Sequence, residues 1–293
     1  MLHHDEITGT GNEMNVEKRD FDKEAASWDE DPHRVKLATD IATAISQQIT
    51  LKPDMDVLDF GCGTGLLTLR MAPLVRSITG VDSSRGMLNV LREKATKQCQ
   101  TNIRVLQLDP DRGDTVTGQY DLIVSTMTFH HIENVEVLLG QLHGAIRFPG
   151  YLCVADLDPD QGQFHKDNAG VFHFGFERTT LRQSFMQTGF AGIKDVTAAE
   201  VVKPMHNGEI RRFTVFLMVG QKDALRVYDK GQHTTGQSEP RKSRQPLRSP
   251  LTLTSPFLAL VSSGPDPKPS RKPGPRRDQR QNRSLPPSPS QTP

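Results

Sequence analysis

Residues 57–65, with the sequence Val-Leu-Asp-Phe-Gly-Cys-Gly-Thr-Gly, decide the fold of this chain. Their apolar start indicates a buried strand, and Asp59 stands near the end of that strand. Glycines at alternate positions follow, and residues 66–76 have the pattern of a helix. A strand that passes through a glycine-rich turn into a helix is typical of the opening unit of an α/β nucleotide-binding fold.

The spacing of the glycines indicates the class of ligand. Gly61, Gly63 and Gly65 let the backbone pass close to a ligand, because glycine has no Cβ and tolerates positive φ. The start of the following helix adds backbone N–H groups that have no partner within the helix. A dinucleotide fingerprint would place its third glycine at position 66, where this chain has leucine. Leu66 therefore disfavours a nicotinamide-dependent oxidoreductase, which remains an alternative.

The pattern Asp-x-Gly-x-Gly-x-Gly that begins at Asp59 resembles the first motif of the class I S-adenosylmethionine-dependent methyltransferases. The resemblance extends over residues 21–222 and is to small-molecule-type members of the family. It implies a Rossmann-like, seven-stranded, mostly parallel sheet with helices on both faces and an antiparallel hairpin at one edge. It also implies the cofactor S-adenosyl-L-methionine, held by residues of this turn, namely Asp59, Gly61, Cys62, Gly63 and Gly65.

A second acidic residue, Asp82, ends the strand predicted over residues 77–82 and follows the last glycine of the turn by 17 residues. A carboxylate at the end of the second strand can accept hydrogen bonds from both hydroxyls of a ribose. Asp82 matches the acidic position of the resembled family, and Ser83 beside it is also assigned to the cofactor site. Ser83 and Ser84 can in addition cap the helix predicted over residues 86–97.

Two further strand ends supply candidate cofactor contacts. The strand predicted over residues 103–108 is followed by Asp109, and in the resembled family the acid at this place often binds the adenine amino group. The usual Gly-Asp-Ala is replaced here by Leu-Asp-Pro, so a turn-forming role for Asp109 stays open. The strand predicted over residues 120–125 is apolar enough to be buried on both faces, and its last residue, Ser125, is the second candidate.

His130 is the candidate catalytic residue. It lies in the segment Thr-Met-Thr-Phe-His-His-Ile of residues 126–132, beyond a strand end where open α/β sheets bind ligands. An imidazole titrates near neutral pH and could act as a general base on the methyl acceptor, although a histidine here could instead pack or cap the next helix. The segment lacks both the Asn/Asp-Pro-Pro-aromatic element and the cysteine of two kinds of base methyltransferase, which disfavours those two routes.

The remaining pattern completes an α/β domain. Helices are predicted over residues 21–28, 34–49, 135–147 and 177–188, and strands over residues 151–157, 193–202 and 212–220. In the resembled family such N-terminal helices pack over the cofactor, although plain packing on the sheet explains the pattern equally well. The insertion after residue 157 carries phenylalanine and histidine, and its position predicts a lid or substrate wall above the site. Its aromatic residues could equally seal the core.

Polar residues in this insertion and at the start of the following helix are further candidates for a site. Asp158, His165 and His173 are residue types that bind metals, but their spacing fits no closed set of ligands, so no metal site is predicted. Arg178, at the start of the following helix, could hold an acidic group of the substrate or could be an exposed helix-start residue.

The charge of the chain divides it into parts. The 293 residues carry a net charge of +1, but residues 223–293 hold 13 basic and 5 acidic residues together with 13 of the 20 prolines. This predicts a disordered basic tail over residues 223–293, and the resemblance implies a methyltransferase domain over residues 21–222 that follows a flexible N-terminus over residues 1–20. The tail could bind polyanions weakly, and its apolar stretch 251–261 could dock on a partner.

The cysteine pattern and the resemblance together set the expected function. Three cysteines without paired spacing, no secretory segment and no long apolar run predict a cytoplasmic protein without membrane spans, with the nucleus as another intracellular option. The predicted function is S-adenosylmethionine-dependent methyl transfer to an unidentified acceptor, expected to be a small molecule. The alternative is a non-catalytic scaffold of the same fold that binds partners through its tail.

Overall fold

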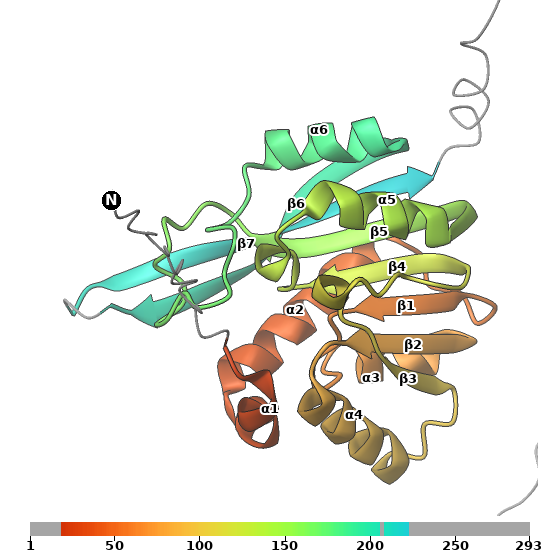
Figure 1. The fold of residues 1–293 in the computed structure, drawn as a ribbon, viewed down its shortest axis with the longest axis horizontal. Helices are drawn as coiled ribbons and strands as arrows, with labels where there is room; N and C mark the ends of the chain where they lie inside the picture. Colours follow the sequence, from red (N-terminus) through yellow and green to blue (C-terminus); the bar gives the residue numbers. More distant parts are fainter. Residues whose placement is uncertain (1–18, 206–207, 223–293) are drawn as a thin grey trace, which may run out of the picture. The chain divides into compact units, whose positions relative to one another are not determined.

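The computed structural model describes residues 19–205 and 208–222. All of them lie in the first of the two units, 1–236 and 237–293, into which the chain divides. The tail predicted over residues 223–293 lies outside the described residues, as does nearly all of the predicted N-terminal segment. Figure 1 shows a seven-stranded sheet with helices on both faces.

The strands of this sheet follow the order β3-β2-β1-β4-β5-β7-β6. The parallel strands are β1 (Asp56–Phe60), β2 (Ser77–Asp82), β3 (Ile103–Gln107), β4 (Tyr120–Thr126) and β5 (Ile146–Leu157). The hairpin strands β6 (Phe190–Pro204) and β7 (Ile210–Lys222) are antiparallel to each other, and β7 is antiparallel to β5. The predicted Rossmann-like sheet with an antiparallel edge hairpin is confirmed. Strand order reverses between β1 and β4, and ligands of such sheets bind beyond the strand ends at this point.

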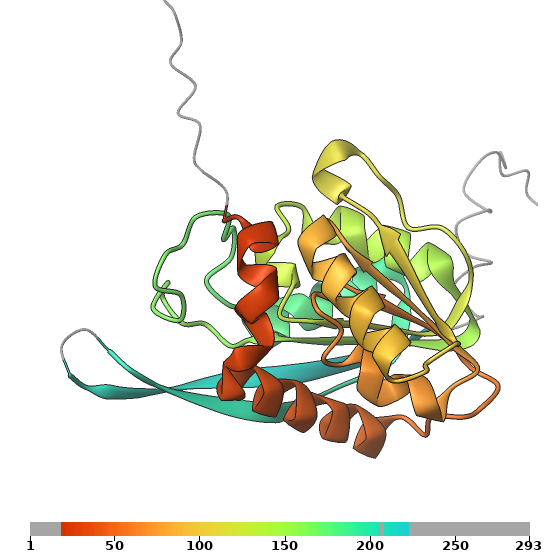
Figure 2. The same cartoon turned by 90° about the horizontal axis from the view of Figure 1, so that it is seen from below.

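Apolar side chains on both faces of the sheet hold the helices. On one face, α2 (Pro32–Gln48) and α3 (Thr68–Met71) contribute to a core that includes Val57 and Val124. On the other face, α5 (Val135–Ala145) and α6 (Arg178–Thr188) pack in a core that includes Leu58 and Ile123. Residues 57 and 58 face opposite sides because successive side chains alternate along a strand. Figure 2 shows α2 running along the β6–β7 hairpin, which it contacts.

The helix after the glycine turn is shorter than the sequence predicts. Instead of spanning residues 66–76, α3 ends at Met71 and continues as a 3₁₀ turn, η2 (Ala72–Leu74). Pro73 explains the correction, because proline has no N–H to donate and its ring clashes with the preceding helical turn. The helix predicted over residues 21–28 likewise divides into two short helices. These are α1 (Phe21–Glu24) and the 3₁₀ helix η1 (Ala25–Glu30).

The strands of the second half are longer than predicted. β5 begins at Ile146 rather than at residue 151, and both hairpin strands extend past their predicted ends. These extensions add backbone ladder hydrogen bonds, which a reading of side-chain pattern does not detect. Of the helices in the described residues, none is long and apolar enough to cross a membrane.

Candidate active site

The three glycines of the turn have different physical roles, although all three have positive φ. A Cβ on Gly61 would lie 2.1 Å from Thr128 Oγ1, and a Cβ on Gly65 would lie 2.2 Å from Leu91 Cδ1. Close packing therefore excludes a side chain at Gly61 and Gly65. A Cβ on Gly63 would meet no protein atom within 4 Å. Gly63 thus borders open space at the middle of the turn.

Asp82 holds this turn from the end of β2. Its Oδ2 accepts a hydrogen bond from the Gly63 N–H at 2.8 Å, and its Oδ1 accepts one from the Ser84 N–H at 2.9 Å. A carboxylate oxygen can accept more than one hydrogen bond, so Asp82 keeps acceptor capacity for a ligand hydroxyl. Burial raises the pKa of Asp82, although the backbone N–H groups oppose the increase. The predicted ribose residue therefore lies directly beside the glycine turn.

Asp59 is completely buried at the end region of β1. Its Oδ2 accepts a hydrogen bond from Thr68 Oγ1 at 2.6 Å, whereas its Oδ1 is buried without a hydrogen-bond partner. Burial raises the pKa of Asp59 to about 7; the Thr68 hydrogen bond opposes this increase and the nearby Asp82 charge adds to it. A buried acceptor that has no donor is costly, and such atoms in native proteins call for a partner.

Cys62 and Ser125 are engaged within the protein itself. The Cys62 side chain packs with Leu88 and Leu91 of α4 (Arg85–Lys97), and burial raises the pKa of its thiol. The Cys62 N–H donates to the Val81 carbonyl at 3.0 Å. The Ser125 hydroxyl is buried and donates to the Phe60 carbonyl at 2.9 Å, which ties β4 to β1.

Ser83 and Asp109 lie at the ends of β2 and β3. Ser83 is exposed, and the helix cap that the sequence offered to either serine is Ser84, whose Oγ accepts a hydrogen bond from the Met87 N–H at 3.1 Å. Asp109 Oδ2 lies 3.4 Å from Arg112 Nε, and the Asp109 N–H donates to Asp114 at 2.9 Å. These contacts shape the turn that follows β3, as the turn-forming alternative for Asp109 expects.

We call Asp59, Asp82 and the glycine turn the cofactor cradle. It fits the predicted cofactor in two respects. The unpartnered Asp59 Oδ1 needs a donor, and the open space at Gly63 admits a ligand close to the backbone. The residues that would hold the cofactor are therefore Asp59, Asp82 and the backbone of the turn around Gly63.

Replacing Gly63 with alanine is expected to weaken S-adenosylmethionine binding by about 10-fold or more, because the new methyl group takes ligand space. The matched control is Gly192→Ala, since Gly192 has φ +58° against +52° for Gly63 and its Cβ would also meet nothing within 4 Å. Both variants should lose roughly 1–2 kcal/mol of stability from the left-handed backbone alone. Calorimetric titration would contradict the ligand role of Gly63 if the two variants bound the cofactor equally well.

The residues after β4 form a second part of the site. Phe129–His131 make a 3₁₀ turn, η4, in which His130 is only 1% exposed. His130 Nδ1–H donates to Asp156 Oδ1 at 2.7 Å, and its backbone N–H lies 3.3 Å from Asp156 Oδ2. Burial alone would raise the pKa of Asp156, but the adjacent His130 ring and the hydrogen bonds to the carboxylate hold it below its ordinary value. The carboxylate therefore fixes the orientation and the tautomer of His130.

Two more histidines surround His130. His165 Nε2 lies 3.2 Å from His130 Nε2, and the ring centroids of His130 and His131 are 4.2 Å apart. His131 Nδ1 lies 2.7 Å from the Gly170 carbonyl, to which it donates. Burial and the adjacent His130 lower the pKa of His131 to about 4 and that of His165 to about 3. We call His130, His131 and His165 the histidine cluster.

The predicted insertion folds over this cluster. The N–H groups of Phe172 and His173 donate to the His130 carbonyl at 2.9 and 3.2 Å, and Gly170 holds His131. Phe172 and Phe174 are 47% and 48% exposed and do not seal the core, whereas Phe164 of the same insertion is buried in it. The segment thus contacts the histidine cluster, and its role as a lid or substrate wall stays a prediction.

The N-terminal helices reach both parts of the site. Asp29 Oδ1 accepts a hydrogen bond from Thr64 of the glycine turn at 2.6 Å, and Asp22 accepts one from the Gly86 N–H of α4 at 2.8 Å. Phe21 contacts His131 edge-to-face with a centroid distance of 5.3 Å. Residues 21–30 therefore bridge the cofactor cradle and the histidine cluster.

Other residues weighed from the sequence have structural roles. Arg178 makes two hydrogen bonds of 2.7 Å to Asp158 and one of 3.0 Å to Thr197, so its guanidinium is engaged within the protein and does not fit the substrate role considered for it. His173 Nε2 lies 2.9 Å from the Ile132 carbonyl. Asp158 and His173 are thus bound elsewhere, and His165 is the only one of the three weighed metal ligands that joins the histidine cluster.

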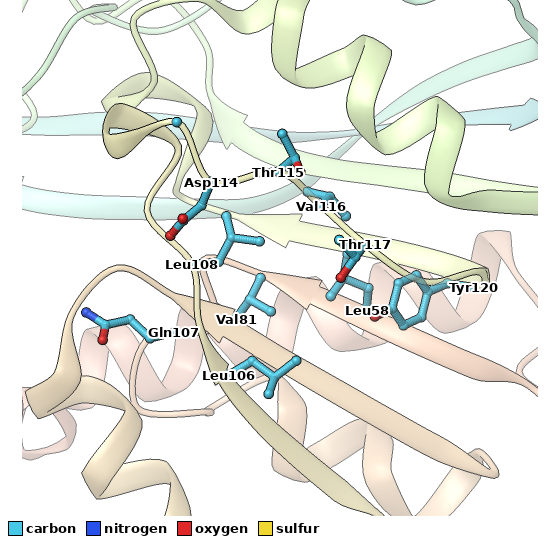
Figure 3. A pocket seen from close by; sticks show the side chains of 11 residues that line it. Leu58, Val81, Leu106, Gln107, Leu108, Asp114, Thr115, Val116, Thr117 and Tyr120 are labelled. Carbon is cyan, nitrogen blue, oxygen red and sulfur yellow. The ribbon is translucent and has the colours of Figure 1, made fainter.

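A hollow with a volume of about 390 Å³ lies on the sheet beside this site (Figure 3). Leu58, Val81 and Leu106 line it from the strands, and Asp114 and Val116 line it from the segment after β3. The chain between β3 and β4 forms only the short 3₁₀ turn η3 (Pro110–Arg112), so no α-helix connects these two strands. None of the predicted site residues lines the hollow.

Sequence reasoning missed the roles of Asp156, His131 and His165. The place of Asp156 could have been expected from the pairing of β4 with β5. Thr126 pairs with Ala155, so Asp156 follows at the same end of the sheet as His130. The approach of His165 had no such signal, since an irregular loop brings it back over the turn.

The comparisons with known proteins match the central part of the chain. A family model described as a methyltransferase domain matches residues 57–150. An uncharacterized methyltransferase of Schizosaccharomyces pombe is 30% identical over 159 residues, which cover 50% of this chain and 56% of that protein. Malonyl-[acyl-carrier protein] O-methyltransferase of Acetivibrio thermocellus is 25% identical over 188 residues, which cover 62% of this chain and 61% of that protein. The chain therefore spans little more than half the length of these relatives.

Solved structures share the fold. The YcgJ protein of Bacillus subtilis matches with a TM-score of 0.54 and 16% identity, over 62% of this chain and 97% of that chain. Phosphoethanolamine N-methyltransferase 2 of Haemonchus contortus, solved in complex with S-adenosyl-L-methionine, matches with a TM-score of 0.50 and 15% identity, over 62% of this chain and 52% of that chain. At such identities these likenesses support the fold and not a particular substrate.

Proposed function

We propose that this chain is a class I S-adenosylmethionine-dependent methyltransferase, an enzyme that transfers a methyl group from this cofactor to a small-molecule acceptor, because its methyltransferase domain match, its relatives and its fold all support this assignment. When bound, S-adenosylmethionine supplies an electrophilic methyl group on a sulfonium. The chain then has to hold the cofactor, align the acceptor and exclude water.

The observation that carries this proposal is the glycine turn clamped by Asp82. The 2.8 Å hydrogen bond from the Gly63 N–H to Asp82 joins the turn after β1 to the end of β2, and β1 borders the switch point that lies between β1 and β4. Asp59 adds a buried oxygen without a donor beside this clamp. An anionic, partly unsatisfied cradle of this kind suits a ligand that carries hydroxyl and ammonium donors.

The acceptor end is proposed to lie at the histidine cluster. Thr128 packs on Gly61, so the turn that carries His130 is the direct neighbour of the cofactor cradle. Asp156 orients the His130 ring, which supports a role for His130 in activating the acceptor. The lid over the cluster would exclude water from this end of the site.

The test is a pair of measurements on the full chain. Calorimetry should detect binding of S-adenosylmethionine and of its demethylated product. A screen of small molecules with cofactor labelled at the methyl group should then find an acceptor that becomes labelled. Absence of binding for both cofactor forms would refute the proposal, and binding without transfer to any acceptor would favour the scaffold alternative.

Asp82→Ala is expected to weaken cofactor binding by about 1–3 kcal/mol, or about 5- to 150-fold, the scale of hydrogen bonds to a charged group. Asp82→Asn keeps one carbonyl acceptor and should bind with intermediate affinity. Asp40→Ala, which removes a carboxylate on the surface of α2, serves as the control for net charge. Titration calorimetry compares the three variants, and an Asp82→Ala affinity equal to that of the control would exclude the ribose role.

A further inference from the structure

The histidine cluster has the geometry of a metal site. One ring nitrogen from each of His130, His131 and His165 lies within 4.8 Å of the corresponding atoms of the other two. The Nε2 atoms of His130 and His165 are 3.2 Å apart. Two nitrogens bound at about 2.0–2.1 Å to one tetrahedral zinc ion lie roughly 3.4 Å apart, so this pair already has the required separation. A shift of at most about 1.4 Å in the third ring would bring its nitrogen from the 4.8 Å limit to the same separation.

Two of the three rings are held through Nδ1, the ring nitrogen that would point away from a bound ion, as metal-binding histidines usually are. His130 donates its Nδ1–H to the Asp156 carboxylate at 2.7 Å, and His131 donates its Nδ1–H to the Gly170 carbonyl at 2.7 Å. Each hydrogen bond leaves Nε2 of its ring unprotonated and free to bind a cation. Carboxylate and carbonyl partners of this kind are the usual outer-shell partners of metal-bound histidines.

We infer that His130, His131 and His165 bind a divalent transition-metal ion, with zinc favoured by the all-imidazole donor set. Three protein nitrogens leave one tetrahedral position open, which is the pattern of reactive rather than closed structural zinc sites. His131 and His165 are partly exposed, so an ion has access to the site. The buried Asp156 carboxylate supplies negative charge behind His130, opposing the positive charge of Lys203 on the side of His165.

This inference goes beyond methyl transfer and changes the expected role of His130. With an ion bound, His130 Nε2 is a ligand, so His130 would act on the acceptor through the ion and not as the proton-accepting base. The open position would then take an oxygen, nitrogen or sulfur atom of the acceptor. A direct hydrogen bond between the rings of His130 and His165 is the competing explanation of their 3.2 Å distance.

The experiment is a titration of the metal-free full chain with Co²⁺ as a spectroscopic probe, followed by competition with Zn²⁺. We expect one ion per chain with the visible absorption of tetrahedral Co²⁺, displaced by Zn²⁺. His165→Ala should lower the affinity at least 100-fold. Asp156→Asn should lower it by about 10- to 100-fold, as changes in outer-shell partners do.

Controls separate this site from incidental binding. His173→Ala removes a partly buried histidine of the same loop and should leave the affinity unchanged, as should replacement of His3 and His4 near the start of the chain. His165→Cys should restore binding and add a sulfur-to-cobalt absorption band, which a misfolded variant would not produce.

The inference is overturned if the full chain binds no Co²⁺. It is also overturned if His165→Ala binds as tightly as His173→Ala while thermal unfolding shows both variants to be folded, since the rings then share only a hydrogen bond. None of these readouts uses S-adenosylmethionine, so a failure of the proposed function would be seen separately.

Discussion

Replacing His130 with alanine is expected to lower the methyl-transfer rate by about 10²- to 10⁴-fold, the contribution of a group that assists proton removal from the reacting atom. The affinity for S-adenosylmethionine should stay unchanged, because no contact joins the His130 side chain to Asp59, Asp82 or Gly63. The expectation holds whether the ring acts directly or through a bound ion. The measurement is kcat with the identified acceptor, together with the dissociation constant of the cofactor from calorimetry.

A second, separate variant is needed as a comparison, because removing His130 leaves the Asp156 carboxylate buried without its side-chain partner. An unpaired buried charge of this kind destabilises proteins by several kcal/mol. His130→Gln keeps an amide donor for Asp156 but cannot take a proton at neutral pH. It should unfold closer to the wild-type temperature and be as inactive as His130→Ala. His173→Ala is the control for loss of a neighbouring imidazole. Full activity of a folded His130→Gln variant would remove His130 from the reaction.

The ligand-free protein is expected to lose up to about 4 kcal/mol of stability between pH 4 and pH 7 through Asp59. The pKa of Asp59 is raised from 3.8 to about 7 in the folded protein, chiefly by burial. Between these values the folded state holds a proton that the unfolded state releases. The unfolding free energy therefore falls as pH rises through this window and levels off above pH 7.

Urea unfolding at pH 5 and pH 7.5 measures this effect, and Asp59→Asn is the informative variant. An amide has the shape of the neutral carboxyl group but does not ionise, so the variant should lose most of the pH dependence. Burial also raises the pKa of Asp82, which contributes to the remaining pH dependence with the same sign. Equal pH dependence in wild type and Asp59→Asn would show that Asp59 is ionised in the fold at neutral pH.

Much of the fold follows from local pattern. Buried parallel strands such as β1 and β4 are continuous apolar runs because helices cover both faces of the sheet, and such runs are visible in the sequence. Boundaries are less visible. Pro73 shortens α3, and the ends of β5, β6 and β7 depend on ladder partners that are distant in sequence.

The residues proposed to bind the cofactor were visible in the sequence, since Asp59 lies near the end of β1, the glycines follow this strand and Asp82 ends β2. The sequence did not show why each of the three positions is occupied by glycine. The sequence presents Gly61, Gly63 and Gly65 as equivalent, but Thr128 and Leu91 exclude a side chain at two of them and leave Gly63 alone beside open space. Packing between segments that are far apart in the chain makes this distinction.

The sequence by itself determined the strand–turn–helix unit, the acidic strand ends and the resemblance to methyltransferases, because these depend on neighbours within one α/β repeat. Only the tertiary structure decided that His130 faces Asp156 and His165 and that Arg178 is occupied by Asp158. Strand β5 and the loop after it supply those partners across 20 or more positions of sequence. Chain folding, and not residue spacing, sets such distances, so the histidine cluster exists only in the folded protein.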